Sequence, residues 1–381
     1  MRAARLVFGI LTSLCLLACL TLPIAAEESE AVTMPPAYTD LGYTLPEELA
    51  DLLPDGLFSE SLEESLAAAS TLSDWEYLLH TLLSAVGLRL HDALGLLCTL
   101  VGLTLISAVL GRLREGMSGT SGEGFGFCLR LALYTLIVTQ TAGMVSTVQT
   151  FFTQLGRFAG GMIPAVGGLY ALGGNMGEAA VSGEILGVLL VICEYVSVSV
   201  TPPLCALCMS FALMDALGTR LTLSPLAAQI KKWYTSLLGA VMFLLTVTLS
   251  AQSVLVGRAD SLGMKGVKYA VGQFLPVVGL SVAGTLPTVA AGVSALRGVC
   301  GVSGIILLAL LLLPTLVELL LMRAALTLSS TVASLLGCDG EARLISEMAS
   351  LHGYLAATVS ICSITFALAL ALFVSGAVAL A

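Results

Sequence analysis

The chain has 381 residues, 57% of them hydrophobic and only 11% charged, and a formal net charge of −9. A soluble domain carries about 25% charged residues, so this composition excludes a soluble protein and predicts a polytopic membrane protein in the lipid bilayer. The apolar segments are long, rich in Leu, Ala and Val, and do not alternate with polar residues, which favours an all-α transmembrane helical bundle over a β-barrel. No basic patch with interleaved aromatic residues occurs in the sequence, so we expect no binding to nucleic acid.

Residues 1–26 have the features of a secretory signal peptide. Arg2 and Arg5 precede an apolar stretch, and small residues end at Ala26, which predicts cleavage after Ala26. Two alternatives are an uncleaved signal anchor and a lipid attached at Cys19, since the residues before that cysteine resemble a lipoprotein box.

Residues 27–78 form an acidic segment, which we expect outside the cytoplasm because it follows the signal peptide. Its first fifty residues contain thirteen Asp or Glu and no Lys or Arg. The spacing of its later apolar residues predicts one amphipathic helix over residues 62–79. The composition is typical of a solvated spacer, and a small arm that binds a partner protein is the alternative.

Apolar segments long enough to cross a membrane follow. A span needs about 20 apolar residues, and the segments that meet this length alone are 93–111, 127–149, 236–256, 299–321 and 353–379. A further apolar run, residues 185–217, is interrupted by Pro202 and Pro203. Because proline breaks or kinks a helix, this run forms either one kinked span or a span with a short second leg. We group residues 79–157 as the N-terminal transmembrane helices.

An octet that contains Gly and Pro occurs twice. Residues 160–167 read GGMIPAVG, and residues 272–279 read GQFLPVVG. Proline removes a backbone hydrogen bond and glycine permits sharp bends, so each octet predicts a broken helix or a re-entrant hairpin buried inside the bundle. An ordinary span kinked at its proline is the alternative. The predicted breaks are Gly160, Pro164 and Gly167 in the first octet and Gly272, Pro276 and Gly279 in the second.

The similarity extends beyond the two octets. Each octet is followed by an apolar span with a proline near its end, then by a charged amphipathic stretch and a last span. We therefore predict an internal duplication, with residues 158–256 as the first membrane repeat and residues 270–381 as the second. Transporter folds commonly contain such repeats, with broken helices at the repeat interface.

Two carboxylates lie inside apolar segments, Glu194 and Glu318. A charged side chain at mid-helix costs about 2.5–3.5 kcal/mol in lipid, so both residues are candidates for a pore or an ion path. The alternative is a protonated carboxyl group, or one that is hydrogen-bonded between helices. No nucleotide-binding, metal-ligand or nucleophile motif occurs in a credible setting, so we expect no catalytic residue, no metal, no cofactor and no enzymatic activity.

The order of these segments resembles a known family. The likeness is carried mainly by residues 258–325, which begin RADSLGMKGVKYAVGQFLPVVGLSVAGTL and continue through GVCGVSGIILLALLLLPTLVELLLMRAA. These segments resemble the stage III sporulation protein AE family of endospore-forming Firmicutes, and the first copy, MIPAVGGLYALGG, is similar to that family more loosely. The resemblance covers roughly residues 90–381, and no functional residue transfers with it.

The resemblance implies a subunit of the channel complex that links the mother cell and the forespore and supports development after engulfment. It places the chain in the mother-cell membrane around the forespore, as a multi-pass protein that acts with other membrane proteins of the same complex. The residues themselves also allow a second class, a secondary transporter or permease for a small solute or ion.

Overall fold

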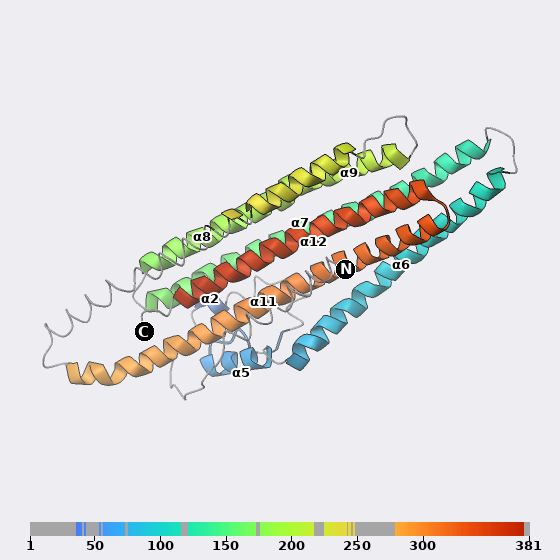
Figure 1. Cartoon of the computed structure of the whole chain (residues 1–381). Helices are drawn as coiled ribbons and strands as arrows, with labels where there is room; N and C mark the ends of the chain where they lie inside the picture. Colours follow the sequence, from blue (N-terminus) through green and yellow to red (C-terminus); the bar gives the residue numbers. More distant parts are fainter. Residues whose placement is uncertain are drawn as a thin grey trace.

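The computed structural model of the chain describes residues 36–39, 42, 53–54, 56–72, 75–115, 121–172, 176–216, 225–241, 243–244, 247 and 279–376. Within these ranges the chain forms helices and no β-strand (Figure 1). The long helices are α6 (Trp75–Glu115), α7 (Ser121–Leu172), α8 (Met176–Tyr195), α9 (Thr201–Ala216), α11 (Gly279–Leu335) and α12 (Asp339–Gly376). Residues 225–241 are helical as well. The prediction of an all-α bundle is confirmed.

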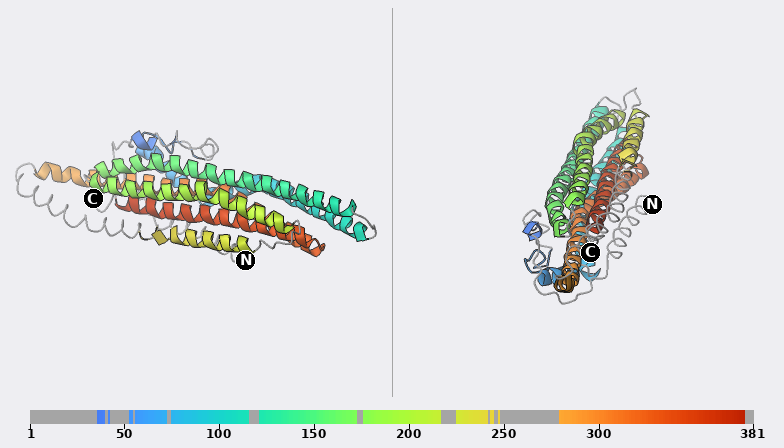
Figure 2. Two further views of the ribbon diagram at one scale, coloured as in Figure 1. Left: turned by 90° about the horizontal axis from the view of Figure 1, so that it is seen from above. Right: turned by 90° about the vertical axis from the view of Figure 1, so that its left-hand side faces the viewer.

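The long helices lie side by side along one elongated bundle (Figure 1, Figure 2). Helix α11 packs against α12 on one side and against α6 on another. Among the described residues, five helical stretches are long and apolar enough to cross a membrane: Arg89–Arg112, Arg130–Gly168, Gly183–Asp215, Ser303–Leu335 and Asp339–Ala371. The chain is therefore a multi-pass membrane protein.

A tight turn joins α11 to α12. Gly337 has a φ of +78°, a conformation that L side chains rarely adopt. The N–H of Gly337 donates to the Ser334 carbonyl at 3.1 Å, and the N–H of Cys338 donates to the Ala333 carbonyl at 3.0 Å. This pair of bonds is a Schellman motif, which ends α11 and satisfies its last carbonyls. Asp339 then begins α12 with a negative charge at its N-terminus, where the helix dipole favours one.

The first octet does not break its helix, contrary to our expectation. Helix α7 continues through Pro164 to Leu172. The proline ring is on the exposed side of the helix, whereas Met162, Ala165 and Val166 are fully buried in the core. Proline inside a helix costs about 3 kcal/mol, and the burial of its neighbours on both sides offsets that cost. The octet therefore belongs to an ordinary helix.

The second octet lies outside the described residues up to its last glycine. Residues 248–278 lie outside the described residues, and Gly279 is the first residue of α11. The predicted breaks at Gly272 and Pro276, the signal peptide over residues 1–26, and the internal duplication therefore stay predictions.

The apolar run interrupted by two prolines forms one helical path. Helix α8 passes through a short π-helix, η1 (Val196–Val200), and continues as α9. The N–H of Thr201 bonds the carbonyl of Val196, five residues earlier. Of the two alternatives for this run, the structure has one irregular span, Gly183–Asp215.

Part of the acidic segment packs onto the bundle. Helix α2 (Pro36–Thr39) lies against α7, and helix α5 (Leu62–Leu72) lies against α11. Tyr38 is fully buried, with its hydroxyl 3.0 Å from the Ser303 hydroxyl and its ring 5.5 Å from the Phe58 ring. The described part of the segment is therefore not a solvated spacer. The helix expected over residues 62–79 is also divided, because α5 ends at Leu72 and α6 begins at Trp75.

Candidate functional site: a polar pocket between three helices

Within the described residues, three ion pairs join helices that are distant in the sequence. Arg89 of α6 pairs with Glu318 of α11, and Arg130 of α7 pairs with Glu341 of α12. Lys231 pairs with Glu347 of α12. Each pair crosses a helix interface in an apolar bundle, where a charge without a partner would be costly.

Glu318 occupies the most unusual position of these residues. It lies 15 residues after the start of the apolar stretch Ser303–Leu335, near its centre. The Arg89 Nη1 atom is 3.2 Å from the Glu318 Oε2 atom, and only 9% of the Glu318 side chain is exposed. The Arg89 side chain is 37% exposed, so this guanidinium keeps contact with the surroundings of the bundle. The buried carboxylate is therefore neutralised by a cation at the start of the apolar stretch of α6, Arg89–Arg112.

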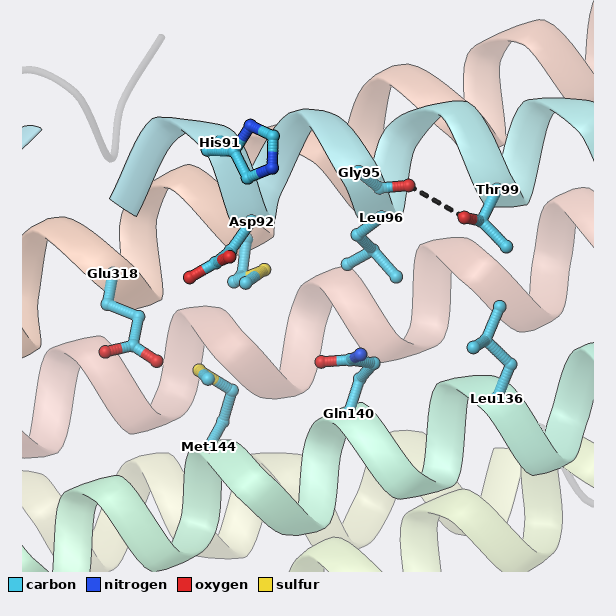
Figure 3. Close-up of a pocket in the computed structure, with 10 residues that line it drawn as sticks. His91, Asp92, Gly95, Leu96, Thr99, Leu136, Gln140, Met144 and Glu318 are labelled. Atoms are coloured by element: carbon cyan, nitrogen blue, oxygen red, sulfur yellow. Dashed lines mark hydrogen bonds between the residues drawn. The ribbon is translucent and has the colours of Figure 1, made fainter. Parts of the chain in front are cut away.

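A cavity of about 390 Å³ opens beside this ion pair, between α6, α7 and α11 (Figure 3). Figure 3 shows the carboxylates of Asp92 and Glu318 directed toward the same space, with Gln140 and Met144 facing it from α7. The Thr99 hydroxyl donates to the Gly95 carbonyl at 2.8 Å and is satisfied within α6. The complete lining is His91, Asp92, Gly95, Leu96, Thr99, Leu136, Gln140, Met144, Glu318 and Met322.

The chemistry of this lining is that of a small polar binding pocket. It presents two carboxylates, one amide and one imidazole against a wall of Leu and Met side chains. Binding sites of this kind are mostly apolar, with a few polar groups that fix the ligand. No group of three His, Cys, Asp or Glu side chains in the described parts of the chain is arranged to hold a metal ion.

The structure separates the two carboxylates that the sequence suggested together. Glu318 lines the pocket, whereas Glu194 is exposed on α8 and does not contribute to the lining. Arg89, Asp92 and Gln140 were not predicted as site residues. Their only sequence signal is that they are polar groups at the edge of, or within, the apolar stretches of α6 and α7.

A second polar cluster lies where η1 meets α12. The Tyr234 hydroxyl is 2.8 Å from the Thr201 hydroxyl and 2.7 Å from the Thr358 hydroxyl, and all three residues are buried. Thr201 also donates to the Val196 carbonyl at 2.9 Å, which is the carbonyl at the start of η1. The Tyr234 ring packs edge-on against Tyr354 at 5.9 Å. This chain of hydroxyls ties the irregular part of the α8–α9 path to α12.

A third cluster fixes the opposite end of α6. The Glu341 Oε1 atom accepts a hydrogen bond from the Ser107 hydroxyl at 2.9 Å and lies 3.2 Å from the Arg130 Nε atom. The adjacent Cys338 thiol donates to the Thr104 carbonyl at 3.8 Å. Burial, together with the Glu341 carboxylate, raises the pKa of the Cys338 thiol. These contacts hold the α11–α12 turn against α6 and α7.

Most of the chain matches a known protein family. The model of the family described as stage III sporulation protein AE matches residues 58–377, which include the pocket and all three ion pairs. None of the curated proteins matches the chain. None of the solved structures matches it either.

Proposed function

Because this chain belongs to the stage III sporulation protein AE family, we propose that it is a membrane subunit of the channel complex that joins the mother cell to the forespore. In this role it supports the development of the endospore after engulfment. It resides in the mother-cell membrane around the forespore and assembles with other membrane proteins of the same complex. The observation that carries the proposal is the family match over residues 58–377.

The architecture of the chain suits a structural subunit. The described helices hold few charged residues, and the charged residues of the three ion pairs join helices to one another. The packed part of the acidic segment, with Tyr38 against Ser303, adds a folded element outside the apolar stretches. Such a bundle binds its partners and needs no catalytic residue, metal or cofactor.

A second candidate function is a secondary transporter for a small solute or ion. The pocket favours it, because Glu318 and Asp92 face one cavity that opens between α6, α7 and α11. Intramembrane carboxylates of this kind mark ion and substrate paths in transporters. If the protein is a transporter, the pocket holds the transported species. If it is a structural subunit, the pocket is only the space left beside the ion pair.

Deletion of the gene in the endospore-forming host tests the first proposal. We expect the deletion strain to complete engulfment and then to stall, and a wild-type copy of the gene to restore spores. Normal spore yield in the deletion strain would exclude the channel role. The neighbouring genes discriminate as well: genes for ring-forming or secretion-ATPase-like proteins favour the complex, and a metabolic operon favours a transporter.

The pocket separates the two candidates in the same strain. Glu318→Gln keeps the volume of the side chain and removes its charge. A transporter that uses this carboxylate loses flux while the protein still accumulates in the membrane. A structural subunit keeps spore formation as long as the bundle assembles.

A further inference from the structure

The α8–α9 path has a backbone break that lies in the bilayer under any placement of the membrane. The apolar stretch Gly183–Asp215 has 33 residues, and a span needs about 20. Every 20-residue window within this stretch contains η1 and Pro202. Hydrocarbon cannot hydrogen-bond a free backbone group, so irregular backbone at this depth occurs only against protein or water.

Two carbonyls at this break lose their usual donors. In an α-helix the N–H of each residue bonds the carbonyl four residues earlier. Pro202 and Pro203 have no N–H, so the carbonyls of Val198 and Ser199 receive no hydrogen bond from them. On the inner side of the break, the hydroxyl and the N–H of Thr201 both bond the Val196 carbonyl.

The outer side of the break is exposed on the bundle. A stripe of exposed residues runs along α8 and α9, which lie along one edge of the bundle in Figure 1. We call it the α8–α9 stripe; it comprises Val188, Val191, Glu194, Val198, Ser199 and Pro203. It therefore joins a carboxylate, a hydroxyl and the irregular backbone on one outward face. Interfaces between membrane helices contain polar groups of this kind.

The neighbouring helix presents the opposite charge on its outer face. Arg157 of α7 is exposed and lies within the apolar stretch Arg130–Gly168. A Cβ atom on Gly156 would lie 3.7 Å from a methyl group of Leu190, so α7 and α8 are in contact at this level. The antiparallel register puts Arg157 about 7 Å along the axis from Glu194. In the part of the chain that the structure describes, neither charge has a hydrogen bond or an ion pair.

We propose that the α8–α9 stripe is an interface between copies of this chain, in which Glu194 of one copy pairs with Arg157 of the next. The two charges lie on neighbouring helices that are in contact, so a two-fold contact between copies forms the pair twice, once in each direction. The second copy supplies protein surface over the outer side of the break. It also neutralises two charges that would otherwise face lipid. The inference does not depend on the channel role.

Photo-crosslinking from the α8–α9 stripe tests whether a second copy of this chain covers it. Benzoyl-phenylalanine replaces Ser199 in the full-length protein in its own membrane, and the matched control carries it at Val109. Val109 is 58% exposed in the α6 span, far from the stripe. We expect an adduct of twice the chain mass from position 199 and none from position 109. An adduct within one chain, with a different protein or only with lipid would overturn the proposal, as would equal dimer adducts at both positions.

Charge reversal identifies the pair itself. Two differently tagged copies are co-expressed, and the fraction that copurifies is measured for Arg157→Glu, for Glu194→Arg and for a mixture of the two variants. Like charges then meet in each variant alone, so we expect copurification to fall about tenfold in each. In the mixture a contact between one variant and the other again joins opposite charges, so copurification of the two variants returns. If the two residues instead pair within one chain, the mixture cannot recover, and that result would refute the interface.

Discussion

Removal of the Arg89 charge isolates the contribution of the ion pair at the pocket. The change is Arg89→Gln, which leaves the Glu318 carboxylate in place. That carboxylate is 9% exposed in the middle of the α11 span, and its partner atom is 3.2 Å away. Without the guanidinium, the carboxylate either stays charged in apolar surroundings or takes up a proton. Both outcomes lower the free energy of unfolding.

The magnitude follows from the exposure of the two partners. Breaking a fully buried ion pair costs about 3–5 kcal/mol. Arg89 is 37% exposed, so this pair is less buried than a fully enclosed one, and we expect a loss of about 2 kcal/mol for Arg89→Gln. Glu318→Gln should cost less, about 1 kcal/mol, because the freed arginine can extend its side chain to the surface of the bundle.

Unfolding of the purified protein in mixed micelles, followed by circular dichroism as the SDS fraction rises, measures these losses. The double variant should be less destabilised than the sum of the two single variants, because the second change removes a partner that is already lost. Arg112→Gln is the matched control: it removes an exposed arginine at the other end of the same span and should change stability by less than about 0.5 kcal/mol. Equal losses for both single variants, with an additive double variant, would refute the argument.

Three further changes test other contacts of the fold. Tyr234→Phe removes the hydroxyl that bonds two buried threonines, and we expect a loss of about 1–2 kcal/mol in the same SDS titration; an unchanged midpoint would mean that the chain of hydroxyls is not formed. Gly337→Ala forces a Cβ into a φ of +78°, and since no neighbouring atom lies within 4 Å of that Cβ, the expected loss of about 1 kcal/mol comes from the backbone alone; a stabilised variant would contradict the turn as described. Cys338 is buried and its thiol has a raised pKa. In variants that keep a single cysteine, maleimide should therefore label Cys338 more slowly than the exposed Cys128, and the labelling rate should rise with pH. Faster labelling of Cys338 than of Cys128 would place the α11–α12 turn away from α6.

The helical class of the fold follows from the sequence because it depends on composition and segment length. Long apolar runs such as residues 299–321 have only one way to satisfy their backbone in lipid, and that way is local. The proline of the first octet shows where local rules fail. Pro164 predicts a break, but Met162, Ala165 and Val166 are held in the core on both sides, and this packing is decided by helices elsewhere in the chain.

The candidate site was predicted only in part for the same reason. Glu318 is conspicuous as a carboxylate in an apolar run, so the sequence indicates it without any partner. Arg89 looks like an ordinary charged residue at the start of an apolar stretch until α6 and α11 are placed together. Tyr234 gives no signal, since a tyrosine near the end of an apolar segment is common in membrane proteins.

The contact between Tyr38 and Ser303 has a consequence for the order of biosynthesis. The two residues are 265 positions apart. At about 5–20 residues per second, the ribosome needs on the order of 13 to 53 s to reach the serine after it has made the tyrosine. During that interval the aromatic ring has no α11 surface to pack against. Docking of the N-terminal segment is thus a late event in maturation, because it requires that α11 has been made.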